Sequence, residues 1–583
     1  MIFNYFRRID WVFLAITLVL VYAQVWLELE IPGYMANITS IMTGGGTSAE
    51  VMEEGKWMLA CAFGSLLLAI VVGLFIASMG TSVGKAMRER QFDQVEKYSS
   101  AEINRFSIYS LITRSTNDVN QVQTAFILGL MVAIRAPMMA ALAIMKISSK
   151  NIGWVEVTVF CVLVMLACIG AILWFTFPRF KRIQWMNDDV NRITKEGLSG
   201  IHVVHAYNAE GYQEGKFKKA NDELTGTHVS VTRAMAFLQP VMTTIMSMLG
   251  LAIYWLGAVI ISEAEGLEER LIDFSDMIVF SSYAMQIIAA FMMLIIVFMI
   301  LPRAMVAARR IDEVVSTQPT ILDGDVVESP AGMEGRISFR NVSFRYPGAA
   351  QDALTDISFD VEKGETVAII GSTGSGKSTL VKLIPRFYDV GSGEVVVDGV
   401  NVKDYRLDAL HRKIGYVPQK AVMFQGTVAS NVNYGDTEGE RTEEDVRKAI
   451  EIAQGAEFVE RMEGGYEGKV AEGGTNLSGG QKQRLSIARA VCRRPELYIF
   501  DDSFSALDYK TDRQLRSQLK KETAGVTTII VAQRIGTIRD ADKIVVLDEG
   551  RVAGIGKHED LLRECEVYYQ IARSQLSEEE LVR

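Results

Sequence analysis

The stretch ETVAIIGSTGSGKSTL, residues 365–380, decides the fold of the second half of the chain. It is typical of a buried strand, a glycine-rich loop and the start of a helix, in P-loop spacing. In such a loop the backbone N–H groups turn toward phosphate, and the helix N-terminus adds positive potential. We therefore predict that the loop binds ATP, with Lys377 reaching the β- and γ-phosphates and Ser378 holding Mg²⁺. The predicted ATP-binding run is Gly371, Ser372, Thr373, Gly374, Ser375, Gly376, Lys377, Ser378 and Thr379.

A second apolar strand, ELYIFDD at residues 496–502, ends in two carboxylates. A P-loop fold places its second Mg²⁺ contact on an acidic residue at the end of such a strand, so we assign Asp501 to the metal. From about residue 336 onward, short β-rich runs alternate with helical ones, which predicts an α/β domain. The polar residues 311–335 before it, which include Pro319, Gly324 and Pro330, are predicted to form a linker.

The first 310 residues have a different composition. The whole chain is 49% hydrophobic with a mean hydropathy of +0.17, and its apolar residues gather in long runs in this half. Six runs are long enough to cross about 30 Å of hydrocarbon, which predicts an α-helical membrane bundle with cytoplasmic extensions over residues 1–310 and an ATPase domain over 336–583. The predicted spans are Trp11 to Leu27, Trp57 to Gly84, Val119 to Met145, Val157 to Pro178, Ala234 to Ser262 and Met277 to Pro302.

The connections between the spans alternate in charge. Those at 85–118 and 179–233 are long and basic, whereas those at 28–56 and 263–276 are acidic. The positive-inside rule therefore places the basic connections, both termini and the ATPase domain in the cytoplasm of a multi-pass cell-membrane protein. We expect each basic connection to be a helical hairpin whose tip contacts the soluble domain, around 106–118 and 206–212. Arg7 and Arg8 precede the first run without a cleavage pattern, so we expect a retained helix rather than a signal peptide.

Arg135 is the one charged residue within the six predicted spans. A charge at this depth is costly unless it faces a protein or water-filled interior. Arg135 is therefore a candidate for the substrate cavity, and a structural ion pair is the alternative. The net charge of −10 argues against nucleic acid as a partner. The five cysteines have no metal-ligand spacing and are expected to be small buried hydrophobes.

The motifs beyond the P-loop resemble those of the ABC transporter superfamily. LSGGQ resembles the ABC signature, and the six spans followed by an ATPase resemble an exporter-type half-transporter. The resemblance implies that Tyr346 stacks on adenine, that Gln419 is the Q-loop residue near Mg²⁺, that Asp508 lies in the D-loop and that Glu472 lies in a coupling loop. It also implies that the signature completes the ATP site of a partner chain. The signature residues are Leu477, Ser478, Gly479, Gly480 and Gln481.

Two positions depart from the family pattern. Asp502 stands where the family has its catalytic glutamate, and Gln533 stands where it has a switch histidine. Asp is one methylene shorter than Glu, and Gln carries no imidazolium charge. With Gln419, these residues form the predicted catalytic set of a degenerate site. The pattern resembles the degenerate-site subunit of heterodimeric bacterial multidrug exporters, which implies a second, non-identical half-transporter as partner.

The leading hypothesis is an ATPase in the lipid bilayer that is coupled to export of a small amphipathic substrate, several drugs or a lipid, out of the cytoplasm by alternating access. Hydrolysis would occur mainly at the composite site shared with the partner. A homodimer with two slow sites is an alternative assembly. An importer of the same fold is one alternative function, and an ATP-binding regulatory subunit that does not pump is another. The sequence does not select the substrate, because similar apolar linings serve many ligands.

Overall fold

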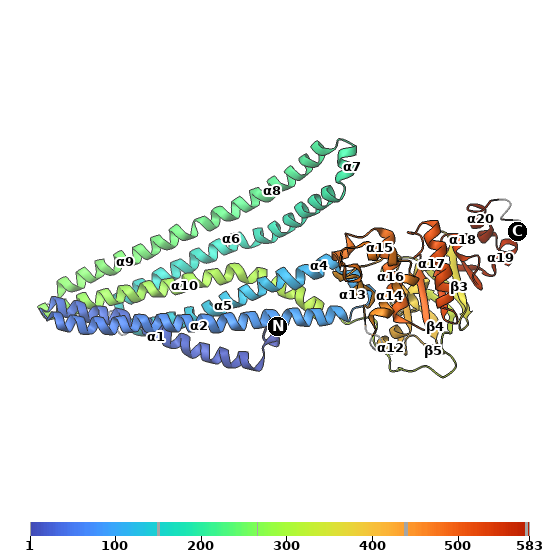
Figure 1. Cartoon of the computed structure of the whole chain (residues 1–583). Coiled ribbons are helices and arrows are strands. Elements are labelled where there is room, and N and C mark those ends of the chain that lie inside the picture. The colour runs from blue at the N-terminus through green and yellow to red at the C-terminus, as the bar shows by residue number, and fades with distance from the viewer. Residues whose placement is uncertain (1, 149–151, 265, 436–440, 578–580, 582–583) are drawn as a thin grey trace. The chain divides into compact units, whose positions relative to one another are not determined.

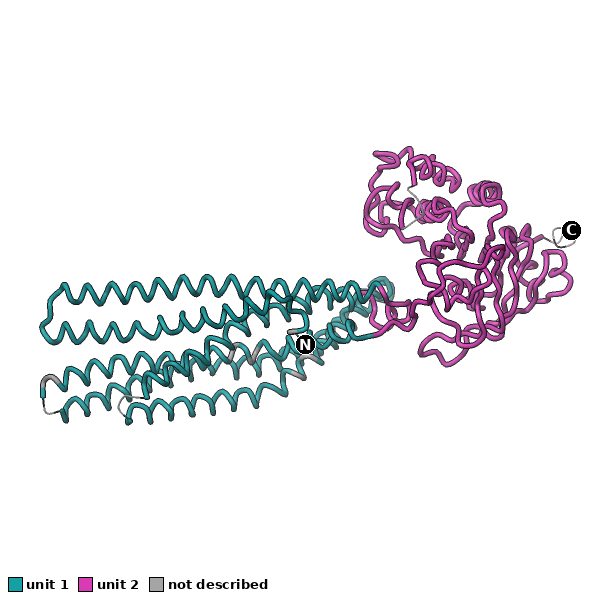
Figure 2. Tube along the Cα trace, turned by 90° about the horizontal axis from the view of Figure 1, so that it is seen from below, with its two compact units in different colours: residues 1–96, 109–317 teal, residues 97–108, 318–583 magenta. Residues whose placement is uncertain are grey.

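The computed structural model describes the whole chain apart from residues 1, 149–151, 265, 436–440, 578–580 and 582–583 (Figure 1). The chain forms two compact units. One consists of residues 1–96 and 109–317, and the other of residues 97–108 and 318–583 (Figure 2). The second unit thus contains a short piece from the first half of the sequence, residues 97–108.

The first unit consists of long helices. Six helical stretches in the described part of the chain are long and apolar enough to cross a membrane, which confirms the six-span prediction. At 1.5 Å per residue, the 49 residues of α2 extend about 74 Å, far beyond the roughly 30 Å of hydrocarbon. The helices therefore continue past the membrane, as expected. Their bounds are α1 (Arg8–Thr43), α2 (Ser48–Glu96), α5 (Val119–Ile147), α6 (Ile152–Ser199), α8 (Glu210–Ala236), α9 (Leu238–Glu263) and α10 (Leu267–Ser316).

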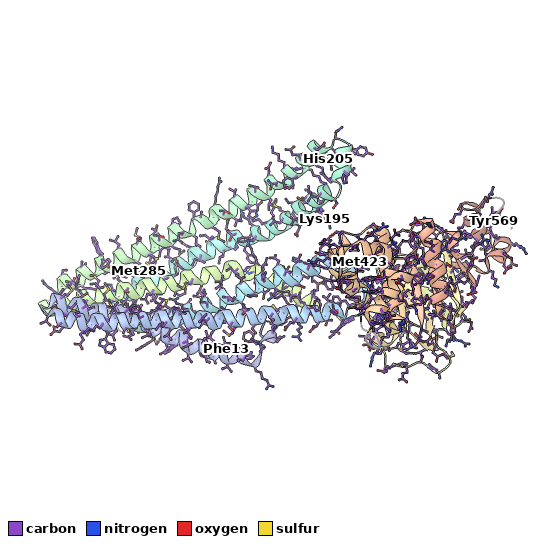
Figure 3. All side chains as sticks on the ribbon, viewed as in Figure 1. Phe13, Lys195, His205, Met285, Met423 and Tyr569 are labelled. Carbon is purple, nitrogen blue, oxygen red and sulfur yellow. The ribbon has the colours of Figure 1, made fainter. Side chains whose placement is uncertain are left out.

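The apolar core of this unit lies both between consecutive helices and between helices that are distant in sequence. α1 packs along α2, and α5 packs along α10, while α6 runs beside α8 and α9 as a long hairpin (Figure 1). Met165, Met242 and Phe280, from α6, α9 and α10, are fully buried in this core. Met285 of α10 packs closely on α9, since a Cβ added at Gly250 would lie 3.2 Å from its terminal carbon (Figure 3).

The hairpin tips lie a few residues before the predicted segments. The first tip is α3 (Ser100–Phe106), and the predicted segment 106–118 instead forms α4 (Ile108–Thr113) and a π-helical turn (Arg114–Asp118) that leads into α5. The Ser99 side chain accepts a hydrogen bond from Ala101 N, and Glu102 bonds back to Ser99 N, so a capping box fixes where α3 begins. The second tip is α7 (Ile201–Ala206), which carries His205 (Figure 3).

The predicted acidic connection at 28–56 is also corrected, because most of it is helical. α1 continues without a break to Thr43, and α2 begins at Ser48. Glu28 therefore lies within a membrane helix and not in a loop after it. This position places a carboxylate within reach of the neighbouring membrane helices.

The second unit contains an α/β domain, which confirms the predicted fold class. Its main sheet has the order β12-β11-β3-β10-β9-β6, in which every neighbouring pair is parallel except β11 and β12. β9 is buried along its whole length and β3 at its four central residues, as the apolar runs predict. The strands are β3 (Thr366–Gly371), β6 (Ile414–Val417), β9 (Leu497–Asp501), β10 (Thr527–Val531), β11 (Lys543–Asp548) and β12 (Arg551–Gly556).

A second, antiparallel sheet has the order β2-β1-β4-β5, with β1 (Ile337–Phe344), β2 (Leu354–Val361), β4 (Ser392–Val397) and β5 (Val400–Asn401). Its apolar residues share one core with β3, β9 and β10. A short pair, β7 (Gly426–Thr427) and β8 (Lys469–Val470), lies among helices. The helices are α11 (Lys377–Leu383), α12 (Leu407–Arg412), α13 (Val428–Val432), α14 (Glu443–Ile452), α15 (Ala456–Arg461), α16 (Gly479–Arg493), α17 (Tyr509–Glu522), α18 (Ile535–Ile538), α19 (His558–Glu564) and α20 (Glu566–Arg573).

Candidate functional site

The parallel register brings three strand ends to one edge of the main sheet. Val531 of β10 pairs with Asp501 of β9 on one side and with Ile369 of β3 on the other. The P-loop after β3, the carboxylates after β9 and Gln533 after β10 consequently lie at the same edge. In parallel α/β sheets, ligands bind at the carboxyl ends of the strands.

The P-loop requires its glycines. Gly374 and Gly376 have φ values of +87° and +96°, which disfavour side chains. A Cβ at Gly376 would also lie 2.7 Å from a Leu354 side-chain carbon and 2.9 Å from a main-chain oxygen. Gly376 caps α11, so the N-terminal N–H groups of this helix face the loop. The backbone therefore has the shape of a phosphate-binding loop.

Lys377 lies within this loop. Its Nζ donates hydrogen bonds to the carbonyl oxygens of Gly371 at 2.9 Å and Ser372 at 2.7 Å. Burial lowers the pKa of the Lys377 ammonium from its ordinary value, and the Asp502 and Asp501 charges oppose the shift. The ammonium is thus held at the loop, where it can meet a phosphate oxygen.

Ser378 and Asp501 meet at the start of α11 and the end of β9. Ser378 Oγ donates a hydrogen bond to Asp501 Oδ1 at 2.7 Å, and Asp501 is 2% exposed. A hydroxyl and a carboxylate are oxygen ligands that suit Mg²⁺, so this pair fits the predicted metal site. Tyr416 of β6 adds a contact that the sequence motifs do not indicate, since its hydroxyl donates to Asp501 Oδ2 at 3.3 Å. Burial beside Asp501 raises the pKa of Tyr416, so the phenol stays protonated.

Asp502 is held by two amides. Its Oδ2 accepts hydrogen bonds from Gln533 Nε2 at 2.7 Å and from Gln419 Nε2 at 3.3 Å. The residue has a φ of +48° and is 8% exposed. Burial raises the pKa of the Asp502 carboxyl above its ordinary value, although the amide hydrogen bonds oppose the rise. The structure thus brings together the three residues of the predicted catalytic set and joins them into one network.

Tyr346 connects the P-loop helix to α3. Its hydroxyl lies 3.0 Å from Thr379 Oγ1, and its ring packs edge-on against Tyr388 with centroids 5.2 Å apart. The Tyr388 hydroxyl accepts a hydrogen bond from Asn104 Nδ2 of α3 at 3.3 Å. Burial raises the pKa of Tyr388, so the hydroxyl remains neutral. Neither Tyr388 nor Asn104 belongs to a motif, so neither was predicted from the sequence.

The signature residues form the start of α16. Ser478 caps this helix, with Ser478 Oγ accepting from Gln481 N at 3.3 Å and Gln481 Oε1 accepting from Ser478 N at 2.8 Å. Leu477 is buried, and Gly480 lies near the carbonyl oxygen of Ala506, since an added Cβ would be 3.4 Å away. Within the described residues, no hydrogen bond joins the signature to the P-loop. The signature loop is thus fixed internally.

Asp508 and Glu472 occupy short turns in the same domain. Asp508 caps α17 through its Oδ1, which accepts from Thr511 N at 3.0 Å. This bond lowers the pKa of the exposed Asp508 carboxyl. Glu472 begins a 3₁₀ turn shortly before the signature.

Arg135 pairs with Glu28 in the membrane unit. Its Nη2 lies 3.0 Å from both carboxylate oxygens of Glu28 on α1. Glu28 was not predicted as a partner of Arg135, because the predicted first span ends at Leu27. The structural ion pair considered as an alternative is therefore present, and the side chain of Arg135 is still 23% exposed.

A P-loop ATPase domain fused to six membrane helices defines an ATP-driven membrane transporter with both parts in one chain. The comparisons give the family. The family model described as ABC transporter matches residues 354–505, and that of the ABC transporter transmembrane region matches residues 14–291. This chain belongs to the ABC transporter family, which confirms the resemblance and implies ATP binding, typically with Mg²⁺, and hydrolysis coupled to transport.

The relatives match over nearly the full chain. The chain is 36% identical to an uncharacterized ABC transporter ATP-binding protein of Mycobacterium tuberculosis, with 98% of this chain and 96% of the relative covered. It is 33% identical to the uncharacterized ABC transporter ATP-binding protein YfiB of Bacillus subtilis, with 97% and 96% covered. An ATP-dependent lipid A-core flippase of Pseudomonas fluorescens is 32% identical, with 85% and 81% covered.

A solved structure has the same fold. A bacterial Atm1-family ABC exporter with ATP bound superposes with a TM-score of 0.79 at 23% identity, covering 98% of this chain and 99% of that one. The chain therefore has the fold of an ABC exporter, with a membrane region and an ATP-binding domain.

Proposed function

We propose that this chain is one subunit of a heterodimeric bacterial exporter that moves a small amphipathic compound, a drug or a lipid, across the cell membrane. The observation that carries the proposal is the hydrogen-bonded carboxylate of Asp502. A second, non-identical half-transporter would supply the competent site. One relative is an ATP-dependent lipid A-core flippase, which supports export of a lipid-like compound.

The geometry around Asp502 supports binding without fast hydrolysis. A general base must reach the water that attacks the γ-phosphate, but Asp502 is a methylene shorter than glutamate and is held by Gln533 at 2.7 Å. A neutral amide at position 533 also supplies no cationic charge to the developing phosphate charge. The P-loop, Lys377 and the Ser378–Asp501 pair retain what nucleotide binding requires. The site therefore has the residues of a nucleotide clamp.

The signature supports the other half of the proposal. Ser478 and Gly480 keep the residue types of an intact LSGGQ, and the capping box orders the loop at the N-terminus of α16. A helix N-terminus with ordered N–H groups suits a γ-phosphate. We propose that this end completes the ATP site whose P-loop belongs to the partner, where most hydrolysis would occur.

The experiment uses the complex of this chain with the half-transporter that co-purifies with it, reconstituted in inside-out vesicles. We expect ATP-dependent uptake of a fluorescent amphiphile. Replacing the partner's catalytic glutamate with glutamine should abolish hydrolysis, whereas Asp502→Asn should reduce it about twofold or less, because the amides still hold a neutral side chain. Loss of all hydrolysis in the Asp502→Asn complex would show that this chain's site is the principal one and would overturn the proposal.

A further inference from the structure

The Arg135–Glu28 pair lies deep within the membrane unit. On α5 (Val119–Ile147), Arg135 is 16 residues from one end and 12 from the other, which corresponds to about 24 Å and 18 Å along the helix axis. A charge at this depth must face protein or a water-filled cavity. The two charges of the ion pair neutralise each other. The hydrogen-bonding groups that remain on the two side chains determine what else the site can bind.

Glu28 has its acceptors occupied. Its Oε1 accepts hydrogen bonds from Gln24 Nε2, Ser65 Oγ and Arg135 Nη2, each at 3.0 Å, and its Oε2 accepts a further bond from Arg135 Nη2 at 3.0 Å. Gln24 and Ser65 are themselves buried. A cationic ligand would have to displace several of these donors to reach the carboxylate.

Arg135 has donors to spare. A guanidinium carries five N–H donors, and the bonds to Glu28 use Nη2 alone. Its Nε is buried and has no hydrogen-bond partner among the described residues. A buried N–H without a partner is unfavourable, so the guanidinium favours an additional acceptor. The pair is therefore unequal: the carboxylate is saturated and the guanidinium is not.

An apolar stripe leads to this guanidinium. Leu128 and Met131 precede Arg135 by seven and four residues, so the three side chains lie on one face of α5. Leu128 is 39% exposed and Met131 is 41% exposed, and the side chain of Arg135 is 23% exposed. A molecule with an acceptor group at one end and an apolar chain at the other fits this face.

We infer that Arg135 binds the oxyanion headgroup, a carboxylate or a phosphate, of an amphipathic substrate whose apolar chain lies along Leu128 and Met131. Guanidinium matches the planar or tetrahedral arrangement of such oxygens. Glu28 is the positioning residue, since it holds Nη2 and leaves Nη1, which has no hydrogen-bond partner among the described residues, for the ligand. The inference rests on the proposed function and narrows its substrate class to acidic amphiphiles.

The chain supplies a matched control. Lys146 and Glu30 form a second ion pair between the same two helices, with Nζ 2.9 Å from Oε1. Lys146 lies next to the last residue of α5 and far from the Leu128–Met131 stripe. Substituting Lys146 removes a cation from the same helix without touching the proposed headgroup site.

The test measures binding to the complex in lipid nanodiscs. The probes are fluorescent amphiphiles with one common tail and a carboxylate, phosphate, trimethylammonium or hydroxyl headgroup, together with inorganic phosphate as a competitor. We expect Arg135→Gln to weaken the two acidic probes about 10- to 100-fold and to leave the other two unchanged. Arg135→Lys should retain part of the affinity, Glu28→Gln should not weaken the acidic probes, and Lys146→Gln should leave all four unchanged.

Three outcomes would overturn the inference. One is an equal loss for all headgroups in Arg135→Gln, with an unchanged thermal unfolding midpoint, since it would show no headgroup preference. Another is the same selective loss in Lys146→Gln. The third is competition by inorganic phosphate as effective as that by the acidic amphiphiles, which would assign the site to a free anion. If Arg135→Gln fails to fold, the double variant Glu28→Gln, Arg135→Gln, which removes both charges, takes its place.

The controls also separate this inference from the proposed function. If the wild-type complex transports the neutral and cationic probes but shows no preference for acidic ones, only the headgroup inference is wrong. If no probe of any charge is bound or transported, the export of amphiphiles is wrong as well.

Discussion

Replacing both departures from the ABC pattern, Asp502→Glu together with Gln533→His, should give this chain a hydrolytic site of its own. The longer side chain extends the reach of the carboxylate by one methylene. The second change removes the amide that holds the carboxylate and supplies a side chain that can carry positive charge. The P-loop and its Mg²⁺ pair are left as they are, so nucleotide binding should persist.

The expected gain in hydrolysis rate at this site follows from two free-energy contributions. A displacement of a catalytic group by about 1 Å costs about 100-fold in rate, or about 2.7 kcal/mol. The hydrogen bond from Gln533 to the carboxylate is 2.7 Å long. Hydrogen bonds to charged groups contribute about 1.5–3 kcal/mol, and this bond must break before the carboxylate can turn. Asp502→Glu alone should therefore recover only part of the rate. The double variant should raise turnover at this site about 100-fold.

The assay must report on this chain and not on its partner. A photoreactive 8-azido analogue of radiolabelled ATP attaches near the adenine, where we expect Tyr346 to stack, and the two chains separate on a gel. Vanadate traps ADP only where hydrolysis has occurred. We expect the wild-type chain to be labelled without vanadate and the double variant to gain vanadate-dependent label. Lys377→Ala should lose both labels, which would assign them to the P-loop.

Two results would contradict this reasoning. In one, the wild-type chain already traps ADP with vanadate as efficiently as the double variant, so that the site is not degenerate. In the other, the double variant binds the label normally in the cold but traps no more ADP than the wild type. The hydrogen-bonded Asp502 would then not be what limits hydrolysis.

Three further changes test other parts of the domain. Tyr388→Phe removes the hydroxyl that accepts the hydrogen bond from Asn104, and with it about 1 kcal/mol of the contact with α3. Stimulation of ATP hydrolysis by substrate should then fall several-fold while the basal hydrolysis rate stays unchanged. Asn104→Ala should have the same effect. Ser378→Ala removes the 2.7 Å partner of Asp501, so nucleotide affinity should fall about tenfold with Mg²⁺ and remain unchanged with EDTA, as measured by fluorescent-nucleotide titration. Burial lowers the pKa of His411 from 6.5, so folding favours the neutral imidazole. The stability that this gives is fully present above pH 6.5 and is lost as the pH falls through the lowered pKa. In thermal unfolding from pH 7 to about pH 5, His411→Gln should therefore lose less stability than the wild type.

The sequence was sufficient to predict the strands and loops that form the nucleotide site. The P-loop and the ELYIFDD strand are local patterns, and parallel strands necessarily bring their carboxyl ends to one edge. The meeting of Ser378 with Asp501 and of Gln533 with Asp502 could therefore be anticipated. Tyr416 and Tyr388 could not, because an aromatic residue in an apolar segment carries no signal that distinguishes a site contact from core packing.

The ends of the helices in the membrane half were harder to predict from the sequence. The first tip begins earlier than predicted because the capping box at Ser99 and Glu102 starts α3, and this short polar signal is weaker than the apolar runs beside it. Glu28 was missed because a charge after an apolar run is normally the end of a span. In this fold α1 continues for another 15 residues beyond Glu28, to Thr43. The ion pair with Arg135 offsets the free-energy cost of placing the Glu28 carboxylate within the membrane.

The contacts of Tyr346 bear on what a slow site could do for a transporter. The path from the P-loop helix runs from Thr379 through Tyr346 and Tyr388 to Asn104 on α3, and none of these contacts involves Asp502. We expect adenine to stack on Tyr346, so occupancy of the site should alter α3 through these contacts, whereas hydrolysis should depend on the separate network around Asp502. We therefore expect a site that binds ATP and rarely cleaves it to retain its influence on the membrane helices. The Tyr388→Phe and Asp502→Glu changes should affect the two properties separately.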